Sequence, residues 1–308
     1  MTFTPKSVTR TAALFAVSLL ALTACTNASA GGAADASGSS TFDPAAVAKD
    51  EALASQVPAA IKARGTLLVG SDTTYPPAEF LGGQDGHTPT GYGADLARAI
   101  GAKLGLKTEI QSADFSGILS SLGPKYDLGV SSYTITKERM QAVNFVSYFN
   151  AGTAWAVKKG NPKGFSLEDV CGKSIGVQTA TIQEDPDLKD RSAKCVAAGK
   201  SPINVVSLKD QSDVTTRLVN GGLDAMAADS PIIGYAIQQT GGQLEKLGST
   251  YDSAPEGIAI AKTDTSWAAL VQKAVSELMA DGSYKKILDT WGTADGAISS
   301  SQVNPAGA

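Results

Sequence analysis

The sequence predicts an α/β protein whose folded part consists of two lobes. Segments with the apolar spacing of strands and of helices alternate from residue 65 to residue 292, which is typical of domains with largely parallel sheets. The alternation runs in two successive blocks, and about 250 residues is large for one hydrophobic core. Segments 152–160 and near 250–260 lie where the chain would cross between the blocks. We therefore predict two lobes, each a mostly parallel sheet flanked by helices, joined by two strands.

The first block is predicted to begin near Asp43, which would cap one helix over 42–57. A second short helix over 57–65 would end at Gly65. In the helix that follows, Leu96, Ile100 and Leu104 stand four residues apart and so share one face. The block is predicted to contain strands at 66–71, 107–112, 127–132 and 152–160 and further helices at 93–105, 115–123 and 136–143.

The second block repeats this alternation. Ser166 would cap a short helix over 166–170, and a strand at 173–179 would lead into a helix that starts within 180–185. Pro231 stands near the start of another helix, where it is tolerated. The remaining predicted strands are 203–208, 223–229 and 256–262, and the remaining helices are 210–222, 230–242, 266–282 and 283–292.

The N-terminal segment has the pattern of an export signal rather than of a folded domain. Lys6 and Arg10 precede an apolar run too short to span a bilayer comfortably, and the run ends in "LTAC" at Cys25. These four residues resemble a bacterial lipobox, in which the cysteine is lipidated; the alternative is an ordinary signal peptide with a chance cysteine. We predict a lipoprotein signal peptide over 1–24 and a flexible tether over 25–42, since the latter is rich in Ala, Gly and Ser.

The two other cysteines and the net charge constrain the environment and the partners. In an exported protein Cys171 and Cys195 are candidates for a disulfide, the alternative being two free buried thiols. The formal net charge is −4, and loss of the signal would make the chain more acidic still. This charge argues against a nucleic-acid partner and against a basic patch for anionic lipid.

Motifs for catalysis or for cofactors are weak in this sequence. The single histidine, His87, stands in a polar stretch rich in turn residues, where a solvated surface role is expected. No HExxH, P-loop or GxSxG motif is present. "GYGADL" begins like a dinucleotide fingerprint, but Leu96 stands in place of its third glycine. We therefore predict no cofactor and no metal.

Polar side chains stand instead where predicted strands end, which is where ligands bind in open α/β sheets. Arg139 offers a planar fork to a carboxylate, and backbone N–H groups near Ala180 and Thr181 add an anion site at a helix N-terminus. Asp229 offers a carboxylate to an ammonium group. The structural alternatives are a surface salt bridge of Arg139 with Glu138 and a helix N-cap at Asp229. Together these groups indicate a zwitterionic α-amino acid.

Four segments carry a resemblance to a known family: "LLVGSDTTYPPAEF", "GYGADLARAIGAKLGLK", "KYDLGVSSYTITKERMQAVNFVSYF" and "LDAMAADSP". Over residues 65–292 the chain resembles the polar amino-acid family of bacterial extracellular solute-binding proteins, which serve ABC importers. The resemblance implies a hinged type II periplasmic-binding-protein-like fold that closes on one amino acid. The expected division is an N-terminal helical segment at 43–64, lobe 1 at 65–154 plus 257–294, lobe 2 at 155–256 and a C-terminal tail at 295–308.

The resemblance also implies a role for each residue that matches a family motif. Arg139 would hold the ligand carboxylate with Thr181, Asp229 would hold the ammonium, and Ser132 and Thr134 would hydrogen-bond either group. The positions expected near the ligand side chain are Asp72, Tyr75 and the aromatic Phe115. The chain departs from the family pattern at Ala78, where Phe is usual, and at Gly93, where Asp is common.

Ligand class and partners follow from these matches. Asp72 near the ligand side chain favours Arg, Lys, ornithine or Gln over Glu or Asp; the alternative is that Asp72 caps a local turn. We expect a monomeric, extracytoplasmic, lipid-anchored binding protein, not an enzyme, whose partners are a free amino acid and an ABC transporter permease. The alternatives are a cyclohexadienyl-dehydratase-like enzyme on the same fold and a surface lipoprotein that binds a protein.

Overall fold

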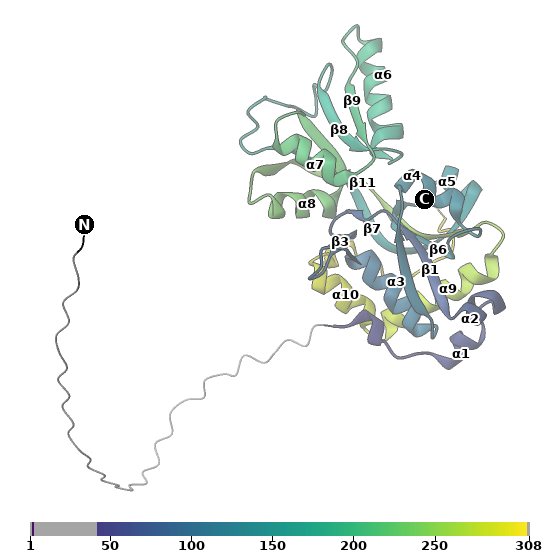
Figure 1. Cartoon of the computed structure of the whole chain (residues 1–308). Coiled ribbons are helices and arrows are strands. Elements are labelled where there is room, and N and C mark those ends of the chain that lie inside the picture. The colour runs from purple at the N-terminus through teal and green to yellow at the C-terminus, as the bar shows by residue number, and fades with distance from the viewer. Residues whose placement is uncertain (1, 3–41, 307–308) are drawn as a thin grey trace, which may run out of the picture. The chain divides into compact units, whose positions relative to one another are not determined.

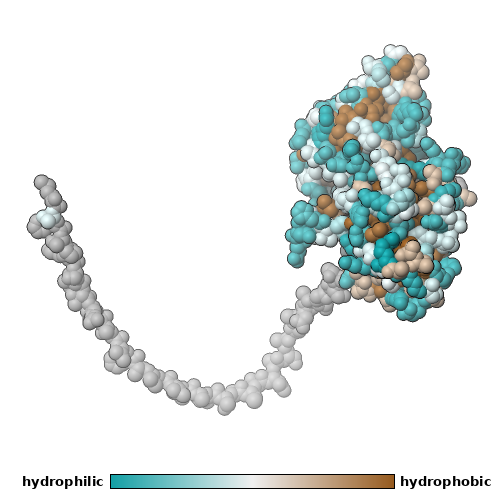
Figure 2. Space-filling view, turned by 45° about the vertical axis from the view of Figure 1, so that its right-hand side comes forward, coloured by the Kyte–Doolittle hydropathy of each residue, from teal (hydrophilic) through white to brown (hydrophobic). Residues whose placement is uncertain are grey.

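The computed structural model of the chain describes residue 2 and residues 42–306. The predicted signal peptide, Cys25 and most of the predicted tether lie outside these residues. Within the described residues, every helix is too short or too polar to cross a membrane. The hydrophilic residues on the face shown in Figure 2 are spread over the whole folded body.

One eight-stranded sheet runs through the folded body. Its two outer groups of strands are parallel, as predicted, because helices connect one strand to the next. Strands β7 and β11 lie in the middle and are antiparallel to their neighbours. The order across the sheet is β5 (Lys107–Ser112), β1 (Thr66–Ser71), β6 (Leu128–Thr134), β11 (Leu244–Ala261), β7 (Val143–Lys158), β10 (Ala225–Asp229), β8 (Ser174–Gln178) and β9 (Asn204–Leu208).

The two long central strands connect the two lobes (Figure 1). We call the part built on β5, β1 and β6 lobe 1, and the part built on β10, β8 and β9 lobe 2. Strands β7 and β11 pair along most of their length, but their register shifts twice between Leu247 and Ala254. This irregular stretch faces Ala151 and Thr153 of β7, so the pairing is weakest where the chain passes between lobes.

Helices cover both faces of the parallel strands, which explains why every residue of β6 and of β10 is buried. The helices of lobe 1 are α1 (Glu51–Ser55), α2 (Ala59–Arg64), α3 (Tyr92–Lys103), α4 (Phe115–Ile118), α5 (Lys137–Ala142), α9 (Thr265–Ala280) and α10 (Ser283–Trp291). Those of lobe 2 are α6 (Lys189–Ala197), α7 (Gln211–Val219) and α8 (Ser230–Gln239). The shorter turns are η1 (Pro44–Ala46), η2 (Leu119–Ser121), η3 (Gln183–Leu188) and η4 (Ala294–Gly296).

Three predicted helices were wrong. The helix over 42–57 is two pieces, η1 and α1, because Asp50 caps a new helix by accepting from the Leu53 N–H. Residues 166–170 form a turn in which the Ser166 hydroxyl accepts from the Glu168 N–H. The expected regular helix after Thr181 is the irregular turn η3, which Asp185 interrupts with non-helical dihedrals just before Pro186.

One helix and one small sheet were missed from sequence. Helix α6 is rich in charged residues and buries only Cys195, so its sequence offers few apolar positions. A small three-stranded antiparallel sheet lies beside the start of α3; it consists of β2 (Thr74–Tyr75), β3 (Glu79–Gly82) and β4 (Thr88–Thr90). These strands are too short to produce a periodic signal.

A disulfide joins Cys171 to Cys195 in α6, with the sulfur atoms 2.07 Å apart. It ties this charged helix to the segment that precedes β8. The C-terminal residues also pack on the body, since the backbone of Asn304 bonds that of Phe145 in β7.

Candidate ligand-binding site

The predicted ligand-binding residues converge on a small cavity between the two lobes. Seven of the eight line it, and Asp72 lies directly behind. The cavity volume is about 10 Å³, which is room for about one water molecule. Its lining residues are Tyr75, Phe115, Ser132, Thr134, Arg139, Gln178, Thr181, Ile182, Gln183 and Asp229.

Four larger cavities, of about 140, 510, 530 and 600 Å³, lie elsewhere on the described part of the chain. None of the eight residues predicted to bind the ligand lines any of them. We assign the site to the small cavity because oppositely charged groups from both lobes meet there. Its volume is small because side chains of the two lobes contact each other across it.

Asp229 ends β10 and is 5% exposed. One carboxylate oxygen accepts from the Tyr75 hydroxyl at 2.7 Å and the other from the Gln183 amide at 2.9 Å. Asp229 occupies the N-cap position of α8, but its side chain makes no capping hydrogen bond. The structural alternative of a helix cap is therefore not realised, and the carboxylate points into the cavity.

Arg139 reaches the cavity from α5, which Thr136 caps by accepting from the Arg139 N–H. Its guanidinium donates to the Thr134 carbonyl in lobe 1 at 2.8 Å and to the Ala180 carbonyl in lobe 2 at 2.9 Å. Arg139 forms no ion pair with any residue in the described part of the chain, so the structural alternative of a surface salt bridge with Glu138 or a neighbour is not realised there.

The aromatic wall of the cavity lies beside the guanidinium. Phe115 stacks on Tyr133 with ring centroids 4.4 Å apart. The Arg139 guanidinium carbon lies 5.6 Å from the Phe115 ring centre and 5.5 Å from that of Tyr133. This contact orients the guanidinium without neutralising it.

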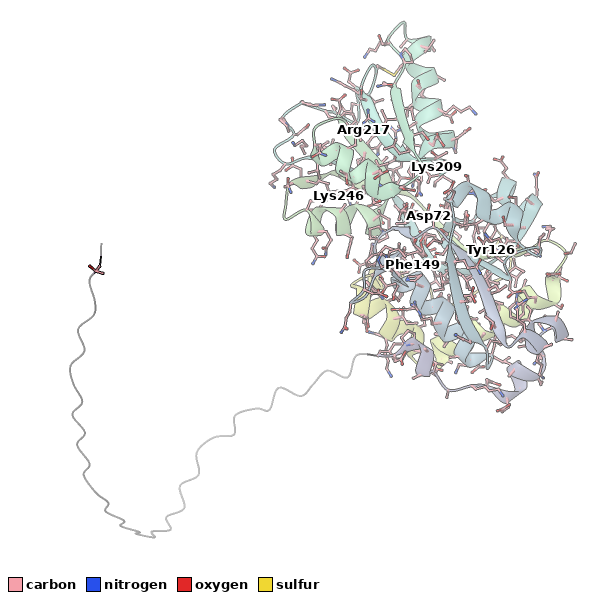
Figure 3. The ribbon with its side chains drawn as sticks, in the orientation of Figure 1. Asp72, Tyr126, Phe149, Lys209, Arg217 and Lys246 are labelled. Carbon is pink, nitrogen blue, oxygen red and sulfur yellow. A yellow bond between two sulfur atoms is a disulfide. The ribbon has the colours of Figure 1, made fainter. Side chains whose placement is uncertain are left out.

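Asp72 caps the local turn, which was the alternative considered for it, and also contacts lobe 2. One oxygen accepts from the backbone and the hydroxyl of Thr74 at 3.0 and 2.7 Å, which is the local turn cap. The other accepts from the Gln178 amide of lobe 2 at 2.5 Å. Gln178 also donates to the backbone carbonyl of Lys209 at 2.8 Å, and Figure 3 labels Asp72 and Lys209 near the junction of the lobes.

The lobe 2 wall differs from the expected helix terminus. The Ala180 N–H donates to the Glu184 carboxylate at 2.6 Å, so an acid of the chain already occupies this predicted anion site. The Thr181 hydroxyl donates to the Gln178 carbonyl at 2.7 Å. The expectation of a ready anion site was wrong for Ala180, because the irregular turn η3 brings Glu184 back over it.

Comparison with known proteins bears directly on this two-lobed arrangement. Residues 67–294 match a family described as bacterial extracellular solute-binding proteins, family 3. The match includes every residue that lines the small cavity. The chain belongs to this family. The resemblance, the type II fold and the solute-binding role expected from sequence are confirmed.

Several amino-acid-binding proteins are similar to this solute-binding protein. Arginine-binding protein ArgT of Corynebacterium glutamicum is 35% identical over 80% of this chain and 81% of its own. L-cystine-binding protein TcyJ of Escherichia coli K12 is 28% identical over 76% of this chain and 85% of its own. An ancestral arginine-binding protein bound to arginine is 35% identical with a TM-score of 0.67, and the match covers 74% of this chain and 98% of that one. The structure of an ancestral arginine-binding protein bound to glutamine is 36% identical with a TM-score of 0.65, and the match covers 75% of this chain and 99% of that one.

Sequence reasoning missed three residues that line the cavity of this solute-binding protein: Gln178, Ile182 and Gln183. Gln178 ends the buried strand β8, so its position at a strand end was the available signal. Gln183 is buried and bonds Asp229, but it lies within the turn η3 that the sequence did not indicate.

Proposed function

We propose that this solute-binding protein captures a polar L-amino acid with a basic or amide side chain and delivers it to an ABC permease. It acts outside the cytoplasm as a monomer, held to the membrane by a lipid on Cys25 after removal of residues 1–24. It is a binding protein rather than an enzyme or a receptor for another protein. The observation that carries the proposal is the meeting of Arg139 and Asp229 at one small cavity between two lobes.

In the proposed complex the α-carboxylate binds Arg139 and the α-ammonium binds Asp229. Each group then replaces a contact within the protein: the carboxylate replaces the Ala180 carbonyl, and the ammonium replaces the Tyr75 hydroxyl. Both replacements exchange a neutral partner for an oppositely charged one, which strengthens the hydrogen bond. Micromolar affinity requires about −8 kcal/mol, and a charged pair with several hydrogen bonds supplies much of it.

The proposed ligand side chain lies towards Asp72, Gln178 and Phe115. Burial raises the pKa of Asp72, while hydrogen bonds from Thr74 and Gln178 oppose this rise. A cationic or amide group would donate to the Asp72 carboxylate, whereas an acidic ligand would meet it with like charge. Two relatives support this class of ligand. ArgT is named as an arginine-binding protein, and an ancestral arginine-binding protein was solved with arginine and with glutamine.

The test is a thermal-shift screen of the twenty amino acids with ornithine and citrulline, followed by calorimetry on Arg139→Ala. We expect a basic or amide amino acid to raise the melting temperature of the wild type. Arg139→Ala should stay folded and lose at least about tenfold in affinity, since one charged hydrogen bond contributes about 1.5–3 kcal/mol.

Lys137→Ala is the matched control, because Lys137 is an exposed base on the same turn of α5. It should bind like the wild type. Unchanged affinity of Arg139→Ala would overturn the assignment of the site. Turnover of prephenate or arogenate would contradict the binding role and favour the enzyme.

A further inference from the structure

Two carboxyl groups lie buried behind the proposed site and do not line its cavity. Glu79 in β3 is 0% exposed and Glu256 in β11 is 1% exposed. No Lys, Arg or His nitrogen among residues 42–306 lies within ion-pair distance of either group. Burying an ionised carboxylate without a counter-charge is costly, so these groups require another explanation.

Glu79 contacts the proposed site through a single side chain. The Ser132 hydroxyl lies 3.2 and 3.4 Å from the two Glu79 oxygens, and Ser132 lines the ligand cavity. Ser132 has a φ of 47°, a left-handed conformation that costs a non-glycine residue about 1 kcal/mol or more. This backbone conformation places the hydroxyl between the cavity and the buried carboxyl.

Gly93 makes room for Glu79. A Cβ atom on Gly93 would lie 2.0 Å from one Glu79 oxygen, so any larger residue would displace the carboxyl group. The glycine and the buried acid are therefore two parts of one arrangement.

Glu256 lies on β11, a strand that connects the lobes, in register with Thr134 of β6. One oxygen accepts from the Tyr148 hydroxyl at 3.4 Å, while the other is buried and has no partner among the described residues. Burial raises the pKa of both Glu79 and Glu256 well above the usual range, and the hydrogen bond from Ser132 to Glu79 only partly opposes this rise for Glu79.

We propose that Glu79 and Glu256 are positioning residues that hold a proton behind Ser132 and release it when the cationic end of a ligand binds. The inference rests on the proposed function. Ser132 has one hydroxyl hydrogen. With Glu79 protonated, Glu79 donates to Ser132, whose own hydrogen turns towards the cavity. With Glu79 ionised, Ser132 donates to it and offers a lone pair to the ligand ammonium.

The positive charge of the ligand therefore takes the place of the proton. The proton passes to bulk water. The surroundings favour this exchange, because the other ionisable groups that face the two glutamates are acids and phenols. They are Asp72 at the end of β1, Tyr75 in β2, Tyr92 in α3, Tyr133 in β6, Tyr148 in β7 and Asp229 at the end of β10. A cation that enters this cluster of acids and phenols lowers the free-energy cost of ionising either glutamate.

The test is calorimetry with the amino acid found in the screen, in buffers that differ in ionisation enthalpy. At about pH 6.5 an α-ammonium group stays charged, so proton release reports on the protein. We expect the wild type to release about half a proton or more per ligand and to bind more tightly as the pH rises. Glu79→Gln and Glu256→Gln should each reduce the release and flatten the pH profile.

Glu277→Gln is the control, because Glu277 is an exposed glutamate on α9, and it should release protons like the wild type. Binding with a buffer-independent enthalpy would overturn the inference and leave the proposed function standing. If Glu79→Gln and Glu256→Gln both release as many protons as the wild type, the inference is overturned and Asp72 or Asp229 is the source of the proton. Affinity that depends on sodium or potassium instead of pH would also overturn it. Failure of every amino acid to bind would overturn the proposed function as well.

Discussion

At the scale of residues, the structure shows for each side chain of the candidate site which of its possible partners it contacts. Asp229 stands at an N-cap position without capping, and Arg139 lies beside Glu138 without pairing with it. Both side chains turn towards the other lobe instead. Asp72 divides its two oxygens between a local turn and lobe 2. A residue type and its neighbours in sequence do not decide between such orientations, because the competing partner comes from a distant segment.

The buried acids also determine how stability should respond to pH. Burial raises the pKa of Glu256 well above its ordinary value of 4.5. As the pH rises past that value the unfolded chain loses this proton and the folded chain keeps it, so stability falls until the folded pKa is passed. We expect Glu256→Gln to raise the melting temperature at about pH 8 by about 2 °C or more, and by less at about pH 5.

Melting curves at the two pH values measure this effect. Glu277→Gln provides the comparison, since an exposed glutamate should leave the difference between the two pH values unchanged. If Glu256→Gln melts at the same temperature as the wild type or lower at the higher pH, the expectation is contradicted. The ionised Glu256 carboxylate would then not destabilise the folded protein.

At the scale of elements, most strands and helices with clear periodicity agreed with the prediction, and short or charged ones did not. The long strands β7 and β11 begin at Val143 and Leu244, well before the segments predicted at 152–160 and 256–262. Strands β1 and β5 have the predicted limits, and Thr136 caps α5 as its position in the sequence indicates. Helix α6 was missed because charged residues dominate it and a disulfide helps to hold it. The turn η3 was missed although Pro186 signals it, because the residue before a proline is disfavoured in the helical region and Asp185 accordingly has non-helical dihedrals.

The disulfide offers a test at this scale. In the chain-entropy model a bridge over about 25 residues contributes about 3 kcal/mol to the free energy of unfolding. The double variant Cys171→Ser, Cys195→Ser should lose about this amount in urea denaturation. It should still bind its ligand, because neither cysteine lines the small cavity.

Wild-type protein treated with a reductant is the matched comparison and should lose the same amount. A denaturation midpoint that is unchanged in both samples would contradict a stabilising role for the bridge.

At the scale of the whole molecule, ligand entry requires the lobes to part. A cavity of about 10 Å³ does not hold an amino acid, and the side chains that close it belong to both lobes. The opposite side of the junction carries an aromatic cluster. Phe80 of lobe 1 lies edge-on to Trp291 with ring centroids 5.6 Å apart, and 5.9 Å from Tyr235 in α8 of lobe 2. Relative motion of the lobes therefore changes the surroundings of Trp291.

We expect ligand binding to change the intrinsic tryptophan fluorescence mainly through Trp291. Trp291→Phe should remove most of the ligand-dependent signal while affinity measured by calorimetry stays near the wild-type value. Trp155→Phe is the control, because Trp155 is fully buried in the core of lobe 2 and packs on Phe165. A signal that survives in Trp291→Phe and disappears in Trp155→Phe would place the moving region within lobe 2.

The sequence by itself determined the fold class, the two-block organisation and most of the side chains that reach the candidate site. These follow from local patterns: apolar periodicity, turn residues, and polar groups at strand ends. Only the tertiary structure decided which partners those polar groups take, that Glu184 covers the Ala180 N–H, and that Glu79 and Glu256 lie buried behind Ser132. The reason is physical: hydrogen bonds and burial depend on segments that are distant in sequence, and the strand β11 that carries Glu256 joins both lobes.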